Sequence, residues 1–228
     1  MSAAGGGSRP RTNVYIDGFN LFHGCLKDGA NRWLDLHAFC RRSLPGDNIH
    51  RIRYFTAVIT ERPGHPNATQ HQLTYLRALA TIPCLTIDYG HFLTSRARMK
   101  AVRPVAGQAT VEVWKTEEKG SDVNLATRML CDAFDRDFEV AAIVSNDSDL
   151  IPPIRVIRQR FGLEVGVLNP QIGFPDPLTD RYRKPTTSYA LKQEVTFYRP
   201  VRPNALAASH FPSRLRDRTG VITRPAGW

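Results

Sequence analysis

The stretch Ala141-Ala-Ile-Val-Ser-Asn-Asp-Ser-Asp-Leu150 decides the fold, because an apolar run of β type stops there at polar residues and a turn. Val140–Val144 is almost continuously apolar, as are strands that are buried on both faces of a parallel sheet. Asp147 and Asp149 follow it, and in an extended segment two residues at this spacing point to the same side. We therefore expect two carboxylates at the carboxyl end of a buried parallel strand.

A second stretch of the same kind is Asn13-Val-Tyr-Ile-Asp-Gly-Phe-Asn20. Residues 13–16 are predicted to form a strand that ends in the Asp17-Gly18 turn, and a helix follows. Asn20 lies three residues after Asp17, at the start of this helix. Its amide is placed to orient a water molecule or a phosphate oxygen in the same crevice.

A third acidic position, Asp122, lies in Glu118-Lys-Gly-Ser-Asp-Val-Asn124, where a helix is predicted to begin after Gly120. Strand ends on the carboxyl side of a parallel sheet open onto one shared crevice. Aspartates gathered there repel one another and raise each other's pKa unless a cation neutralises them. Mg²⁺ and Mn²⁺ prefer oxygen ligands, so the sequence predicts a site for one of these ions. The expected metal ligands are Asp17, Asp122, Asp147 and Asp149.

Each aspartate taken singly also has a structural explanation. Asp17 can stabilise its own turn, since aspartate readily bonds the backbone that follows it. Ser121 or Asp122 can cap one helix, and Asp149 can cap the next. Glu117 and Glu118 either assist the acidic site or stand at a solvated helix entrance, and the entrance is the favoured role. Caps and turns do not explain why four aspartates occupy positions that the fold would bring together.

Strands that alternate with helices predict a three-layer α/β fold with a mainly parallel central sheet. Three domain segments are expected: a Gly/Ser-rich disordered leader over residues 1–11, a globular domain over 12–198, and a basic tail over 199–228. Residues 92–116 lack helical periodicity and are predicted to form an extended hairpin. Further strands are expected at 51–60, 84–89 and 163–168, and helices at 33–44, 68–80 and 152–160.

Composition narrows the class of protein. The chain has 228 residues, 42% of them hydrophobic and 23% charged, and no apolar run approaches the ~20 residues that span a bilayer. The four cysteines form no CxxC pair, which argues against a zinc site and for reduced thiols in a cytoplasmic protein. The net charge of +10 favours an anionic polymer as partner, although a generally basic surface has the same signature.

The segment Ser95-Arg-Ala-Arg-Met-Lys-Ala-Val-Arg103 alternates basic residues with small or apolar ones. In a strand this pattern puts Arg96, Arg98 and Lys100 on one face, where they can follow a phosphate backbone while nearby aromatic residues stack on bases. The alternative is a solvated hairpin edge that its charge protects from aggregation. For the basic tail two roles also stay open, a clamp on RNA or packing back onto the domain.

Three motifs together resemble the NYN domain family, a branch of the PIN-like nucleases that includes bacterial LabA-type proteins. They are Tyr15-Ile-Asp-Gly-Phe-Asn-Leu-Phe22, Glu118-Lys-Gly-Ser-Asp-Val-Asn-Leu-Ala126 and Val144-Ser-Asn-Asp-Ser-Asp-Leu150, and the resemblance spans about residues 12–170. It implies a PIN-like (Rossmann-like) fold and Mg²⁺- or Mn²⁺-dependent cleavage of RNA. Many relatives have Ser-Gly-Asp where this chain has Ser145-Asn146-Asp147. The resemblance gives catalytic roles to Asp17, Asn20, Asp122, Asp147 and Asp149.

These observations predict a metal-dependent endoribonuclease that acts on single-stranded RNA. No membrane partner is expected, and whether the protein forms a homo-oligomer is left open. The alternative is a regulatory RNA-binding protein of this family with little or no turnover. A phosphatase with Asp17 as covalent nucleophile is disfavoured, because Phe19 occupies the place where that chemistry usually has a second acid. The histidines form no paired motif, which favours attack by water over histidine acid–base catalysis.

Overall fold

The computed structural model describes residues 8–27, 30–60, 66–105, 108–175 and 182–228, so residues 1–7 of the expected leader lie outside the described part. A six-stranded sheet forms the centre of the domain, in the order β10-β7-β6-β1-β2-β3. All five strand pairings in it are parallel, which confirms the predicted sheet. Its strands are β1 (Arg11–Asp17), β2 (Asn48–Thr56), β3 (Leu85–Tyr89), β6 (Val140–Val144), β7 (Glu164–Asn169) and β10 (Phe197–Pro200).

The strand order contains a switch point between β1 and β6. The chain first builds outward from β1 through β2 to β3, and then returns to the other side of β1 to add β6, β7 and β10. In open parallel sheets the crevice at the carboxyl ends of such a central strand pair is where ligands bind. Asp17 ends β1, and Ser145 follows directly after β6, so both stand at this crevice.

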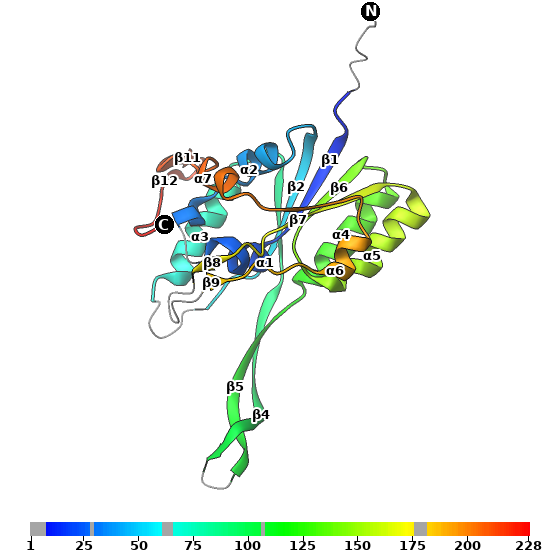
Figure 1. Cartoon of the computed structure of the whole chain (residues 1–228). Helices are drawn as coiled ribbons and strands as arrows, with labels where there is room; N and C mark the ends of the chain where they lie inside the picture. Colours follow the sequence, from blue (N-terminus) through cyan, green and yellow to red (C-terminus); the bar gives the residue numbers. More distant parts are fainter. Residues whose placement is uncertain (1–7, 28–29, 61–65, 106–107, 176–181) are drawn as a thin grey trace, which may run out of the picture.

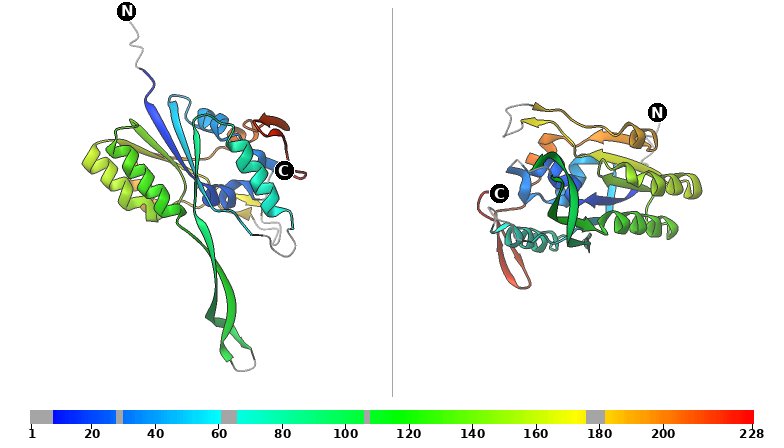
Figure 2. Two further views of the ribbon diagram at one scale, coloured as in Figure 1. Left: turned by 180° about the vertical axis from the view of Figure 1, so that it is seen from behind. Right: turned by 90° about the horizontal axis from the view of Figure 1, so that it is seen from below.

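Helices cover both faces of the sheet and make a three-layer domain (Figures 1 and 2). Alternate residues of β1 point to opposite faces, so Val14 and Ile16 lie in one hydrophobic core and Tyr15 in the other. The first core is covered by α1 (Gly18–Leu21), α2 (Leu36–Ser43), α3 (Ala68–Leu79) and α7 (Pro203–Ala207). The second is covered by α4 (Ser121–Phe134), α5 (Ile151–Val156) and α6 (Tyr189–Gln193).

Several element ends differ from the sequence expectation for local reasons. The helix expected from residue 33 begins only at Leu36, because the Asp35 carboxylate accepts the backbone N–H groups of His37 and Ala38 at 2.9 and 3.0 Å and caps it. The strand expected at 51–60 starts earlier and ends sooner, because it pairs along the length of β1. Short helical turns complete the fold at Phe22–Leu26, Ala30–Trp33, Ser148–Leu150 and Ile157–Phe161.

The basic segment after residue 198 packs onto the domain, which was one of its two expected roles. β10 runs through residue 198 as the edge strand beside β7, and the hairpin β11 (Arg214–Asp217) and β12 (Gly220–Thr223) follows α7. Leu206, Phe211 and Ile222 are buried in the first core. Arg77 of α3 forms an ion pair with Asp217 at 2.6 Å.

The predicted hairpin is confirmed as β4 (His91–Val105) and β5 (Gln108–Lys119), a twisted two-stranded ribbon that projects away from the body of the domain (Figure 1). A much shorter pair, β8 (Phe174–Pro175) and β9 (Tyr182–Arg183), lies beside α1. Among the helices of the described residues, none is long and apolar enough to cross a membrane.

Candidate functional site

Asp17 lies buried at the carboxyl end of β1, with only 7% of its surface exposed. One carboxylate oxygen accepts the backbone N–H of Asn20 at 2.9 Å and so caps α1, and the other accepts the Ser145 hydroxyl at 3.1 Å. The pKa of Asp17 is raised from 3.8 to about 6, chiefly by burial and in smaller part by the charges of Asp122 and Asp147. The turn-stabilising role expected for Asp17 is therefore present, within an environment that disfavours its ionised form.

The loop after β6 brings a second aspartate to the same place. The Asp147 backbone N–H donates to the Ser145 hydroxyl oxygen at 3.2 Å, so Ser145 links the two aspartates. One Asp147 oxygen accepts the backbone N–H of Asp149 at 2.9 Å and starts a helical turn. The chain thus leaves the extended conformation directly after Asp147, so the extended segment on which the expected common side of Asp147 and Asp149 rested ends there. Asp149 is exposed at the rim.

Asp122 comes from the first turn of α4. Gly120 precedes this helix with a left-handed φ of 97°, and the Glu118 carboxylate accepts both the backbone N–H and the hydroxyl of Ser121, at 3.1 and 2.7 Å. Gly120 occupies the cap position of α4, and Glu118, rather than Ser121 or Asp122, supplies the side chain that accepts a backbone N–H of its first turn. Partial burial raises the pKa of Asp122, and the charges of Asp147, Glu118 and Asp149 add to this effect.

A buried polar network fixes α4, and with it Asp122, against the sheet. Arg53 of β2 donates two hydrogen bonds to the Asp132 carboxylate of α4, both at 2.8 Å. The Tyr15 hydroxyl of β1 donates to the same carboxylate, also at 2.8 Å. Paired and hydrogen-bonded in this way, the charges of Arg53 and Asp132 hold their elements in a defined register.

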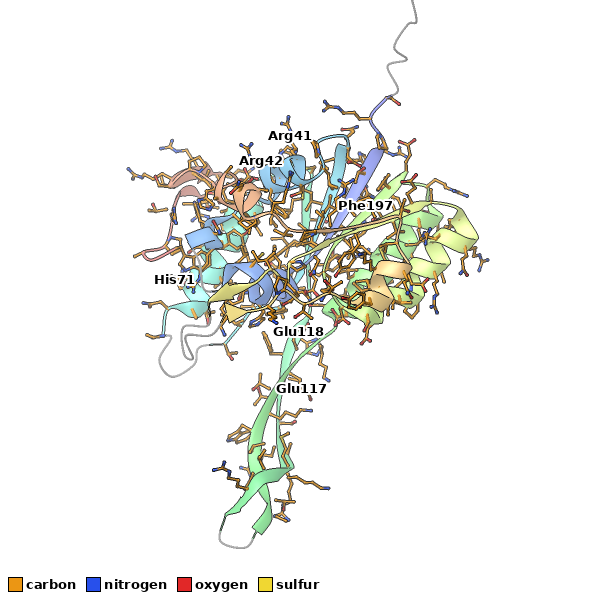
Figure 3. All side chains as sticks on the ribbon, in the orientation of Figure 1. Arg41, Arg42, His71, Glu117, Glu118 and Phe197 are labelled. Carbon is orange, nitrogen blue, oxygen red and sulfur yellow. The ribbon has the colours of Figure 1, made fainter. Side chains whose placement is uncertain are left out.

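One cavity of about 290 Å³ collects these side chains at the switch point. Of the catalytic residues predicted from the sequence, Asp17, Asn20, Asp122 and Asp147 line this hollow, whereas Asp149 does not. Figure 3 shows Glu118 where the hairpin joins the domain body and Glu117 slightly further out along β5. Of the two, only Glu118 lines the cavity. The full lining is Asp17, Phe19, Asn20, His23, Glu118, Ser121, Asp122, Asp147 and Gln171.

Hydrogen bonds orient the Asn20 amide. Its side-chain oxygen accepts the backbone N–H of Asn146 at 3.2 Å and the Gln171 amide at 3.2 Å. Because the backbone N–H of Asn146 can only donate, the amide oxygen of Asn20 must face it. The side-chain NH₂ of Asn20 is therefore available as a donor at the cavity, which suits the expected contact with a phosphate oxygen.

The cavity and the contacts behind its wall include residues that the sequence analysis did not select. Ser145 joins Asp17 to Asp147, and its position directly after β6 was a usable signal. Gln171 follows β7, so it also stands at the carboxyl end of a parallel strand, but nothing in its local sequence distinguishes it. Phe19 contributes an aromatic wall, and its ring packs edge-to-face on that of Phe92 of β4 at 5.7 Å.

The chemistry of the site fits a hard divalent cation. Asp17, Asp122, Asp147 and Glu118 present only oxygen ligands, the type that Mg²⁺ and Mn²⁺ bind. Within the described residues, no Lys or Arg forms an ion pair with any of these four carboxylates. In the same residues no three such side chains close around a common point to make a complete ligand set. The carboxylates thus share one cavity in which no Lys or Arg of the described residues is paired with them.

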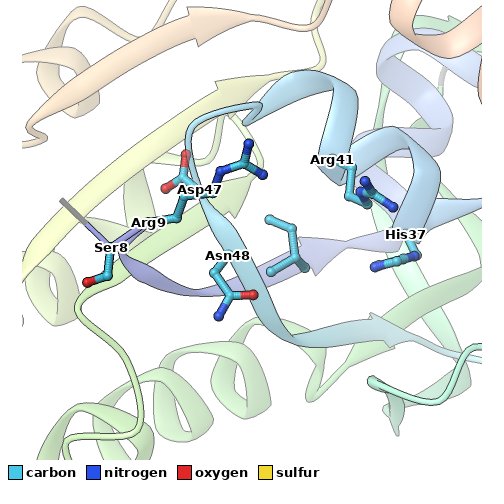
Figure 4. Close-up of a pocket in the computed structure, with 7 residues that line it drawn as sticks. Ser8, Arg9, His37, Arg41, Asp47 and Asn48 are labelled. Carbon is cyan, nitrogen blue, oxygen red and sulfur yellow. The ribbon is translucent and has the colours of Figure 1, made fainter. Parts of the chain in front are cut away.

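A larger hollow of about 530 Å³ lies at the opposite, amino-terminal end of β1 and β2 (Figure 4). Arg9, His37 and Arg41 give it a basic character, and its Asp47 carboxylate accepts the Thr12 hydroxyl at 2.8 Å. It contains none of the residues of the acidic cavity, and size alone does not make it the reactive site.

The predicted RNA contacts lie outside the acidic cavity. Arg96, Arg98 and Lys100 are exposed on β4 and share one face of the hairpin, as the alternation predicted. Their cross-strand partners on β5 are Trp114, Glu112 and Thr110.

A three-layer parallel α/β domain with an acidic cavity at its switch point is consistent with a PIN-like fold. Residues 11–196 match the NYN domain family, and the chain therefore belongs to that family, as its motifs indicated. The LabA-type subgroup stays a prediction.

The chain is also similar to two known proteins, one in sequence and one in fold. It is 32% identical over 188 residues to 6-hydroxy-3-succinoylpyridine 3-monooxygenase HspA from Pseudomonas putida, in a match that covers 72% of this chain and 60% of that protein. This chain thus spans less than two thirds of that relative. The crystal structure of a protein of unknown function from Vibrio parahaemolyticus superimposes with a TM-score of 0.51 at 17% identity, covering 86% of this chain and 95% of the other. That likeness concerns the fold alone.

Proposed function

We propose that this protein is a Mg²⁺- or Mn²⁺-dependent endoribonuclease that hydrolyses phosphodiester bonds of single-stranded RNA. The observation that carries the proposal is the cavity in which Asp17, Asp122 and Asp147 meet, with Glu118 beside them. Such a cluster is unfavourable for the folded protein by itself, because burial and mutual repulsion oppose ionisation of Asp17 and Asp122. Membership of the NYN family supports the same reading.

The residues divide into three roles. Asp17, Asp122 and Asp147 would hold the ion from the cavity, and Asp149 would add negative charge from the rim. When bound, the divalent ion supplies an activated water and neutralises charge on the phosphoryl oxygens. The NH₂ group of Asn20 binds and orients a phosphate oxygen, and Ser145 keeps Asp17 and Asp147 in a fixed relation.

Outside the cavity, Arg96, Arg98 and Lys100 are proposed to contact the phosphate backbone of the RNA. Their exposure and common face support this role, as does the net charge of +10. The four described cysteines are free thiols, which agrees with the proposed cytoplasmic location.

Two other functions give different outcomes in the same assay. A regulatory RNA-binding protein would bind RNA and turn it over little. The name of HspA raises a second candidate, the monooxygenation of a hydroxypyridine, which would consume O₂ and a reductant. The site favours the nuclease, because its converging carboxylates and amide donor suit a phosphate held by a cation.

The test is to incubate the purified protein with end-labelled single-stranded RNA or DNA and either Mn²⁺, Mg²⁺ or EDTA. We expect internal cleavage of RNA with either ion and none in EDTA. RNA that is bound but remains intact with both ions would establish the regulatory alternative. Consumption of O₂ that depends on a hydroxypyridine and an added reductant, without RNA cleavage, would establish the monooxygenase.

A further inference from the structure

The β4–β5 hairpin begins at the wall of the acidic cavity. Phe92, the second residue of β4, packs on Phe19 of that wall, and its cross-strand partner Glu118 is itself a lining residue. From there the two strands run outward, away from the domain body (Figures 1 and 3). A polymer bound in the cavity that extends out on this side therefore runs along the hairpin.

The register of the hairpin separates two chemically different faces. Residues directly opposite in an antiparallel pair lie on the same face, and the Thr94 and Thr116 hydroxyls confirm this with a hydrogen bond of 3.0 Å. We call the face that includes Phe92 and Glu118 the cavity-side face. Further out it carries the cross-strand pairs Arg96–Trp114, Arg98–Glu112 and Lys100–Thr110. The opposite face carries Ser95–Lys115, Ala97–Val113 and Met99–Val111.

Trp114 is unusual on the cavity-side face because 68% of its surface is exposed. The other two tryptophans are in the domain body: Trp33 is buried, and Trp228 packs against Tyr75 at 5.8 Å. The guanidinium of Arg96 lies over the Trp114 ring, 5.1 Å from its centroid. An exposed indole with a cation on one side leaves its other side for a flat partner.

We propose that Trp114 and Arg96 form a base-stacking subsite for single-stranded RNA, separate from the cleavage site and connected to it along the cavity-side face. The inference rests on the proposed function, since it names where that substrate extends. Stacking on an exposed indole is open only to unpaired bases, while Arg96 and Arg98 bind the adjoining phosphates. The subsite therefore selects single strands and tolerates any base.

The geometry also sets a length for the substrate. Four residues separate the Phe92–Glu118 pair from the Arg96–Trp114 pair, which is about 13 Å at about 3.3 Å per strand residue. A stacked strand advances about 3.4 Å per nucleotide. RNA must therefore extend about four nucleotides from the cavity to reach Trp114.

The test measures binding, so that it is independent of cleavage. Oligoadenylates of about two and about twelve nucleotides, labelled with fluorescein, are titrated into the Asp147→Asn protein with Mg²⁺ and into the unmutated protein in EDTA. The shorter oligomer cannot span the distance from the cavity to Trp114. Trp114→Leu keeps apolar bulk but removes the aromatic face, and Trp114→Phe keeps an aromatic face. Lys115→Ala is the matched control, because Lys115 is an exposed cation on the opposite face, next to Trp114 in sequence.

We expect Trp114→Leu to weaken binding of the longer oligomer by about five- to 150-fold, the range for loss of one base–aromatic stack. Trp114→Phe should recover most of this loss, and the shorter oligomer and Lys115→Ala should each change affinity less than about twofold. Equal affinities of the Trp114→Leu and parent proteins for the longer oligomer would overturn the subsite and leave the ribonuclease intact. If neither the Asp147→Asn protein with Mg²⁺ nor the unmutated protein in EDTA binds either oligomer, the subsite and the proposed function both fail.

Discussion

Replacing Asp17 by asparagine should stabilise the protein when no metal is present. The carboxyl is 7% exposed, and its pKa is raised from 3.8 to about 6, first by burial and then by Asp122 and Asp147. At about 1.36 kcal/mol per unit of pKa, this rise corresponds to about 3 kcal/mol that the ionised carboxylate costs the folded state. An asparagine at this position carries no charge and avoids that cost.

Part of the gain is offset by hydrogen bonding. The asparagine oxygen can still accept the backbone N–H of Asn20, but its NH₂ group cannot accept the Ser145 hydroxyl as the second carboxylate oxygen does. One altered hydrogen bond costs about 1 kcal/mol. The net gain is then about 2 kcal/mol above pH 6, or a rise of about 4–8 °C in melting temperature for a chain of this size.

The sign of the pH dependence follows from the raised pKa. Below the unfolded value of 3.8 the carboxyl is protonated in both states, so its ionisation costs nothing. As the pH rises from about 4 to about 6, the unfolded state loses its proton first and the unmutated protein loses stability relative to Asp17→Asn. The advantage of the variant is therefore absent near pH 4 and complete above about pH 6.

Thermal unfolding followed by circular dichroism, in EDTA at about pH 4 and about pH 7.5, measures this difference. Asp135→Asn changes the net charge equally at an exposed site and should shift stability by less than about 0.5 kcal/mol. With saturating Mg²⁺ the order should reverse, because the ion stabilises only a protein that binds it. The reasoning would be refuted if Asp17→Asn were less stable than its parent in EDTA at pH 7.5. It would also be refuted if the stability advantage of the variant were as large at pH 4 as at pH 7.5.

Two further predictions concern activity and RNA affinity. Asp122→Asn and Asp147→Asn should each lower the cleavage rate by at least about a hundredfold without unfolding the protein. Asp149→Asn at the rim should lower the rate by about tenfold, as loss of an outer group of a metal site does. Full activity in Asp147→Asn would remove this residue from the site. Neutralising Arg96, Arg98 and Lys100 together should weaken binding to all RNA sequences and flatten the log–log salt dependence by about 0.7 per lost phosphate contact; an unchanged slope would assign these residues to a solvated edge.

The sequence predicted the parallel sheet and the two strand ends that carry Asp17 and Asp147. Both rest on local patterns: Val140–Val144 is apolar on both faces, and each strand stops at a turn-forming residue. The hairpin was predicted for the same kind of reason, since the alternation around Arg96 and Arg98 has the period of a strand.

Contacts between distant residues were beyond local patterns. The Asp132–Arg53 pair that fixes α4 joins residues 79 apart, and the Gln171–Asn20 contact joins residues 151 apart. Asp149 was expected beside Asp147 because the segment was taken as extended. The Asp147 side chain instead binds the Asp149 backbone and turns the chain, a competition that short polar side chains often win.

The chemical form of the RNA ends tests the central claim most directly. The substrate is an RNA with one 2′-deoxy sugar at the cleaved linkage, incubated with the protein and Mg²⁺ in ¹⁸O-labelled water. Attack of water on phosphorus expels the 3′-oxygen, so the account predicts a 3′-hydroxyl and a 5′-phosphate that carries one ¹⁸O, with the deoxy linkage cleaved only modestly more slowly. The same RNA without the deoxy substitution is cleaved in parallel as the reference. A 2′,3′-cyclic phosphate on the products of this all-ribose RNA, or complete resistance of the deoxy linkage, would contradict hydrolysis at the acidic cavity.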